Sequence, residues 1–211
     1  GKQDFTRHML RFRHNSLLDL TKGDEIPEIV LINSHDGTSS YKLMLGFFRV
    51  VCSNGLVVAS SMVDEVKVRH SGKPDVIDNV IEGSYQLIDQ APVVTKQVEE
   101  FKSTILNQYE QRAFATAALE LNISSLDIDA KQILRARRSE DVGSESERDL
   151  WKTLNCVQEN MIKGGILGTS EKGKLRRTRA IKSIDADTKL NRALWILAEE
   201  MKDARIQINA A

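Results

Sequence analysis

The residues of this sequence best suited to chemistry are cations gathered in a short glycine-rich stretch. Between residues 163 and 182, seven side chains are basic and only Glu171 is acidic. Clustered arginine and lysine beside glycine favour contacts to phosphate oxygens, although a solvated loop balanced by the acidic stretch at 139–149 is the alternative. The candidate nucleic-acid-binding residues in this stretch are Lys172, Lys174, Arg176, Arg177 and Arg179.

A second basic feature lies near the start of the sequence. Residues 5–14 alternate in the manner of a strand, with Leu10 and Phe12 on one face. The other face carries Arg7, Arg11 and Arg13. A row of cations on a half-buried sheet can line a groove for a nucleic-acid backbone, and an ordinary exposed sheet face is the alternative. We therefore add these three arginines to the candidate interface and expect single-stranded DNA as the partner.

Two further basic motifs have simpler interpretations. Residues 168–174 match the GxxxxGK spacing of a phosphate-binding loop, but Leu175 stands where the loop needs Ser or Thr to bind magnesium. The segment before it is helical in pattern, so we interpret the match as a feature of a Gly- and Lys-rich loop. Arg135, Arg137 and Arg138 are expected to end a short helix, where cations favour the helix dipole.

Candidate catalytic and metal-binding residues are few. His35 beside Asp36 could carry out acid–base chemistry, but adjacent residues on a turn usually point apart. Cys52 ends an apolar run and is expected to be a core thiol. Cys52 and Cys156 are far apart and the four histidines are scattered, whereas a structural zinc site needs paired ligands at short spacing. We therefore predict no catalytic residues, no metal and no cofactor, and we favour a binding protein over the open alternative of a hydrolase or nuclease centred on His35 and Asp36.

Composition limits the class of protein. The sequence has 211 residues, of which 41% are hydrophobic and 28% charged, as is typical of globular proteins. No apolar run approaches the roughly 20 residues of a membrane span, so no membrane partner is expected. Two lone cysteines suit a reducing cytosol, and we expect a cytoplasmic protein. The chain begins at Gly1 without methionine, and we expect a trimmed segment with further residues upstream.

Hydrophobic periodicity changes from two to helical at about Pro74. Strands are predicted at 5–14, 26–33, 41–52, 56–60 and 65–70, with a hairpin turn at Asp36-Gly37. Helices are predicted from Pro74, again after Pro92 to about residue 121, and over 150–163 and 185–205, with Trp151 and Trp195 as core residues. This order predicts an α+β fold, in which an antiparallel hairpin sheet precedes a mostly helical part. We divide the chain into 1–125, with the sheet and long helices, and 126–211, a helical region with the basic loop, within one continuous domain.

Several segments together resemble a known family. They are TRHMLRFR at 6–13, IPEIVLINSHDGTS at 26–39, GFFRVVCSNGLV at 46–57, VQENMIKGG at 157–165 and TRAIKSIDADTKLNRALWIL at 178–197. These segments are similar to the YfjQ/YafZ-like family of phage- and plasmid-associated proteins, which is built on a domain of unknown function. The resemblance implies a setting among mobile elements, recombination and anti-defence functions, but no reaction.

Two functions follow as hypotheses. The first is a nucleic-acid-binding protein, similar in outline to single-strand annealing proteins of the Rad52-like type, which bind the backbone and assemble into homo-oligomeric rings. The second is an anti-defence protein that binds a host nuclease or a CRISPR or restriction complex, with the acidic stretch at 139–149 imitating nucleic acid. Fold-level analogy does not fix function, so both hypotheses stay open at this point.

Overall fold

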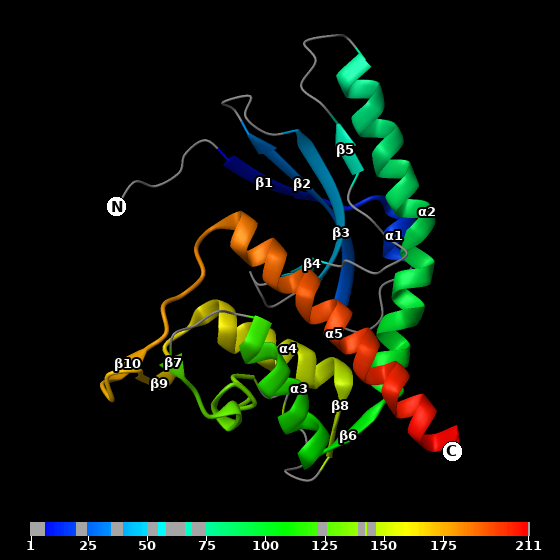
Figure 1. Ribbon diagram of the computed structural model, residues 1–211. Helices are drawn as coiled ribbons and strands as arrows, with labels where there is room; N and C mark the ends of the chain where they lie inside the picture. Colours follow the sequence, from blue (N-terminus) through cyan, green and yellow to red (C-terminus); the bar gives the residue numbers. More distant parts are fainter. Residues whose placement is uncertain are drawn as a thin grey trace. The chain divides into compact units, whose positions relative to one another are not determined.

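The structure is a computed structural model, and it forms two compact units, Gly1–Lys96 and Gln97–Ala211 (Figure 1). The described residues are 7–19, 25–34, 40–49, 55–57, 66–68, 75–121, 126–138, 142 and 147–210. His35, Asp36 and Cys52 therefore lie outside the described residues, as does the turn predicted at Asp36-Gly37.

An antiparallel sheet forms the centre of the first unit, as the sequence predicts. Its strands are β1 (Arg7–Phe12), β2 (Glu25–Ser34), β3 (Tyr41–Arg49), β4 (Gly55–Val57) and β5 (Val66–Val68). The strand order is β1-β2-β3-β4, and β5 also pairs with β3. Leu43, Met44 and Leu45 alternate in direction along β3 and are all buried, which explains why this strand is apolar on both faces.

Two helices contact this sheet within the first unit. The short helix α1 (Asn15–Leu18) buries Leu17, and the His14 ring accepts a hydrogen bond from the backbone of Ser16. The long helix α2 (Asp75–Ser103) approaches β5 closely at Gly83, where a Cβ atom would lie 2.7 Å from Val66 Cγ1. Glycine at this position therefore permits the contact between helix and sheet.

The prediction that Pro92 separates two helices is wrong, because Pro92 lies inside α2. Proline removes one backbone hydrogen bond from a helix interior. The side chain of Pro92 is exposed, so water can bond the carbonyl that loses its partner. The helix instead ends at Ser103, where the hydroxyl groups of Ser103 and Thr104 both donate to the carbonyl of Glu100.

A short strand also divides the helix predicted through residue 121. Strand β6 (Ile105–Asn107) pairs with β8 (Glu147–Asp149), and α3 (Gln108–Leu121) starts after it. Asn107 caps α3 by accepting hydrogen bonds from the backbone of Tyr109 and Glu110 at 2.9 and 3.0 Å. An asparagine that satisfies free N–H groups favours a new helix start at this position.

The second unit is built on helices that share an aromatic core. Helix α4 (Leu150–Lys163) buries Trp151, and α5 (Ile184–Ala210) buries Trp195. The ring of Trp195 lies 5.1 Å from that of Phe101 on α2 and 6.2 Å from that of Trp151. Both tryptophans are thus core residues, as the sequence predicts.

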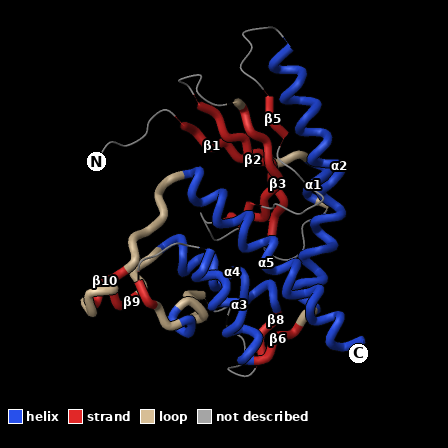
Figure 2. The backbone as a smooth tube through the Cα atoms, in the orientation of Figure 1, coloured by secondary structure: helices blue, strands red, loops and turns tan. Residues whose placement is uncertain are grey.

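A small sheet completes the second unit. Its order is β10 (Leu175–Arg177), β9 (Leu167–Ser170) and β7 (Leu126–Asp127), and all pairs are antiparallel. The stretch interpreted as a Gly-rich loop is therefore a β-hairpin, seen as the red pair β9 and β10 in Figure 2. A 3₁₀ helix, Ala130–Gln132, follows β7. Most of the acidic stretch at 139–149 lies outside the described residues.

Candidate nucleic-acid interface

Two of the arginines predicted to bind nucleic acid are held by a buried carboxylate. Arg11 Nε lies 2.7 Å from one oxygen of Glu28, and Arg13 Nε lies 2.6 Å from the other. The register of β1 with β2 explains the geometry, because Phe12 pairs with Ile29 and the next pair would be Arg13 with Glu28. All three side chains therefore share one face of the sheet.

The Glu28 side chain is only 3% exposed, so its charge needs compensation. Burial by itself raises the pKa of Glu28, but the hydrogen bonds and charges of Arg11 and Arg13 outweigh it and hold the pKa below its ordinary value. Glu28 is thus ionised in the folded protein at neutral pH. The side chain of Arg7 lies outside the described residues, and the role of all three arginines in binding stays a prediction.

The turn of the β9–β10 hairpin is closed by local hydrogen bonds. Ser170 N donates to Lys174 O at 2.9 Å, and Gly173 N donates to Ser170 O at 2.7 Å. Gly173 has a φ of +72°, a conformation that glycine adopts without strain. At Gly168 on β9, a Cβ atom would lie 2.8 Å from Ile128 Cγ1. Gly173 therefore serves the hairpin turn, and Gly168 permits the close approach of β9 to β7. This setting differs from the strand-to-helix context of a phosphate-binding loop.

The hairpin presents all five candidate cations of the second unit to solvent. They are Lys172, Lys174, Arg176, Arg177 and Arg179, and each is exposed. Arg177 donates to the carbonyl of Gly165 at 2.7 Å. Within the described part of the chain, none of the five forms an ion pair with a carboxylate, and the nearest acid in sequence is Glu171 in the turn. Their charge is therefore available to a ligand.

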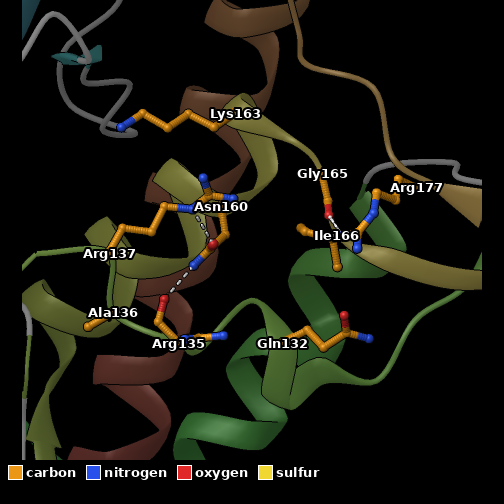
Figure 3. A pocket seen from close by; sticks show the side chains of 9 residues that line it. All are labelled: Gln132, Arg135, Ala136, Arg137, Asn160, Lys163, Gly165, Ile166 and Arg177. Carbon is orange, nitrogen blue, oxygen red and sulfur yellow. Dashed lines mark hydrogen bonds between the residues drawn. The ribbon is translucent and has the colours of Figure 1, made fainter.

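A cleft of about 640 Å³ adjoins the hairpin (Figure 3). Four of its lining side chains are basic, and none of the described lining residues is acidic. The basic ones are Arg135, Arg137, Lys163 and Arg177. Figure 3 shows Arg177 directed toward the Gly165 carbonyl and the Lys163 ammonium directed away from Asn160. The cleft extends the positive surface of the hairpin.

Asn160 on α4 positions the arginine-rich segment that follows the 3₁₀ helix. Its amide donates to the carbonyls of Ile133 and Arg135, at 2.9 Å each. Arg137 donates back to Asn160 Oδ1 at 2.6 Å and to the Gly164 carbonyl at 2.8 Å. Segment 133–138 is thus fixed against α4, with Arg135 exposed at its edge.

A second buried carboxylate holds the other end of this segment. Arg138 donates two 3.0 Å hydrogen bonds to Glu159, which also pairs with Lys163. Burial raises the pKa of Glu159, but the hydrogen bonds and charges of both partners outweigh it and lower the pKa below its ordinary value. The prediction that Arg135, Arg137 and Arg138 end a short helix is wrong, because they lie in an irregular segment that follows the 3₁₀ helix and its C-cap, Ile133.

Backbone contacts tie the hairpin to the end of α4. Gly164 ends the helix with a φ of +63°, and a Cβ atom there would lie 2.6 Å from the carbonyl carbon of Arg179. Gly165 N donates to Thr178 O at 2.9 Å, and Thr178 N donates to Ile166 O at 2.8 Å. The cations of the hairpin therefore project from a fixed base.

Sequence reasoning did not include Arg135 in the candidate interface. The sequence instead predicts Arg135 at a helix end, where a cation favours the helix dipole. The available signal was Asn160 on the buried face of the predicted helix at 150–163, since a buried amide needs partners outside its own helix.

Neither a membrane-spanning helix nor a metal-binding cluster occurs among the described residues. No helix in this part of the chain has the length and apolar character that a membrane crossing requires. No group of three or more His, Cys, Asp or Glu side chains is placed there to hold a metal ion. Cys156 is buried on α4 and directs Sγ toward the Ile133 carbonyl at 3.7 Å.

Comparison with known proteins places the chain in a family. A family model described as "Domain of unknown function (DUF932)" matches residues 1–195. The chain belongs to the DUF932 family. The UPF0380 proteins YafZ and YfjQ of Escherichia coli (strain K12) are each 43% identical to it, over 203 and 202 residues. These alignments cover 95% of this chain and 71% and 70% of the two relatives.

The resemblance to the YfjQ/YafZ-like family is therefore confirmed. No solved structure matches this DUF932 chain. The family match includes β1, the hairpin and the cleft, but its description states no reaction or ligand. The function of the DUF932 chain must be inferred from the geometry of its own residues.

Proposed function

We propose that this chain binds single-stranded nucleic acid through the β9–β10 hairpin and the adjacent cleft. The observation that carries the proposal is the set of exposed hairpin cations that lack carboxylate partners among the described residues. Arg177 belongs to both the hairpin and the cleft lining, so the two form one positive surface. A phosphodiester backbone offers a row of anions that fits such a surface.

The net charge of zero does not oppose this function. Charges more than roughly 10 Å apart are largely screened at 0.1 M salt, so a phosphate responds to the nearby cations rather than to the whole chain. Each neutralised phosphate releases counterions, which makes affinity fall as salt rises. Because phosphate contacts carry no base information, the sequence preference of this surface is expected to be weak.

The test compares two charge-matched double variants. Lys174→Ala with Arg176→Ala removes two hairpin cations, whereas Lys96→Ala with Lys189→Ala removes two exposed cations elsewhere. Binding to a fluorescein-labelled oligothymidine is measured by anisotropy over a range of salt concentrations. The slope of log affinity against log salt is about 0.7 per phosphate contact on single strands, so the hairpin variant should flatten it by about 1.4.

The control variant is expected to keep the wild-type slope, because both proteins lose the same charge. Equal slopes for the hairpin variant and wild type would exclude the hairpin from the interface. Absence of salt-dependent binding by the wild-type protein would reject the proposal and favour the anti-defence alternative, which predicts co-purification with a host protein instead.

A further inference from the structure

A second cavity in the same unit adjoins the basic cleft. It has a volume of about 730 Å³, and residues from the start of α3, the 3₁₀ helix and β8 line it. Arg135 lines both this cavity and the cleft beside the hairpin. A polyanionic strand that follows the cleft can therefore continue into the cavity.

Tyr109 lines this cavity and is 75% exposed. Its backbone is fixed, because its N–H donates to Asn107 Oδ1 at 2.9 Å at the start of α3. Asn107 N in turn donates to the Glu110 carboxylate at 2.7 Å. The exposed ring contributes little to packing in this unit, yet it stands on a rigid helix start. A tyrosine ring loses little conformational entropy when a planar ligand covers it.

The cavity holds an excess of cationic donors. Its basic lining residues are Arg112, Lys131, Arg135 and Arg148, and no described lining residue is acidic. Arg112 pairs with Asp129 at 4.0 Å, and both side chains are more than half exposed, so this pair is weak. Arg148 donates from Nη1 to Leu134 O at 2.9 Å, but its Nε has no acceptor among the described residues.

We propose that Tyr109 is a stacking platform for an unpaired nucleobase, and that Arg112, Lys131 and Arg135 contact the phosphates of that nucleotide. An aromatic ring beside cations combines the two contacts that bind single strands, because every base has a flat face and every nucleotide has a charge. This inference rests on the proposed function and makes it more specific. A paired base is already stacked in its helix, so the platform selects single strands over duplex.

The experiment measures the affinity of three variants for a 15-nucleotide oligothymidine by anisotropy. Tyr109→Ala should weaken binding about 5- to 100-fold, which corresponds to the energy of one base–aromatic stack. Tyr109→Phe keeps the ring and should bind like wild type. Tyr85→Ala is the matched control, because Tyr85 is 54% exposed on α2 in the first unit. The circular dichroism of each variant checks that it is folded.

An abasic oligonucleotide of the same length separates the contribution of base stacking from the contribution of phosphate charge. Wild type and Tyr109→Ala should bind the abasic strand equally, and their salt slopes should coincide, because tyrosine carries no charge. If wild type binds oligothymidine with salt dependence but Tyr109→Ala binds it equally well, the stacking platform is wrong and the proposed function stands. If wild type shows no salt-dependent binding, both proposals fail.

Discussion

Removing the two arginines that surround Glu28 should destabilise the first unit more than removing Glu28 itself. The perturbation is Arg11→Met with Arg13→Met, which keeps the apolar stems and removes the charges. It leaves a carboxylate that is 3% exposed without its two hydrogen-bond donors. Breaking a buried ion pair in this way costs about 3–5 kcal/mol, and the 32% and 45% exposure of the arginines places the cost near 3 kcal/mol.

Glu28→Met should cost about 1–2 kcal/mol, because the half-exposed arginines can turn toward water when their partner is lost. The triple variant, with methionine at positions 11, 13 and 28, should be more stable than the double variant, because it contains no unpaired buried charge. The assay is urea unfolding at pH 7, followed by far-ultraviolet circular dichroism. Both tryptophans lie in the second unit, so their fluorescence does not report this transition directly.

Lowering the pH should remove the stabilisation that the ionised Glu28 provides through Arg11 and Arg13. The pKa of Glu28 in the folded protein lies below its ordinary value of 4.5, so its contribution is complete above pH 4.5 and disappears as the pH falls through the folded-state pKa. The difference between wild type and Glu28→Met should therefore shrink below pH 4.5. A double arginine variant that unfolds at the wild-type urea concentration but binds oligothymidine with a flatter salt slope would refute this reasoning and assign Arg11 and Arg13 to the interface.

Two further predictions concern the second unit. Trp195→Ala should cost about 3–5 kcal/mol, because the side chain is fully buried against Trp151, and the thermal midpoint should fall while the folded protein keeps its affinity for oligothymidine. An unchanged midpoint would contradict its role in the core. Gly164→Ala should lower the midpoint more than Gly165→Ala, because only the first places a Cβ atom 2.6 Å from the Arg179 backbone, whereas both carry the strain of a positive φ. Equal midpoints for the two variants would show that the hairpin base can shift to accept a methyl group.

The sheet of the first unit could be predicted because two of its strands, β2 and β3, are long and have a clear apolar pattern. Strands β2 and β3 have ten and nine residues, and their central residues are buried. The β9–β10 hairpin gave no such signal, because its strands have four and three residues. Leu167 and Leu175 are both exposed, so neither strand has a buried apolar face that would alternate in sequence.

The positions predicted for the helix ends between residues 74 and 121 are wrong for two different reasons. Proline usually ends a helix. Pro92 lies on an exposed surface, where the loss of one backbone hydrogen bond costs little free energy because water can replace it. The true break at 104–107 has no proline or glycine. It depends on Asn107 and on the pairing of β6 with β8, whose residues lie about 40 positions later in the chain, and such a distant partner cannot be found from local periodicity.

The two basic features of the chain show why the number of cations does not identify an interface. Arg11 meets its carboxylate from a residue 17 positions away, and only the register of β1 with β2 brings them together. A slip of one residue would move Glu28 to the opposite face and leave both arginines unpaired. The positions of the hairpin cations depend on a turn of five residues, from Ser170 to Lys174. Glu171 is the single acidic residue in the sequence of this turn. Their positive charge therefore follows from local sequence alone, which is why the hairpin, rather than β1, carries the binding proposal.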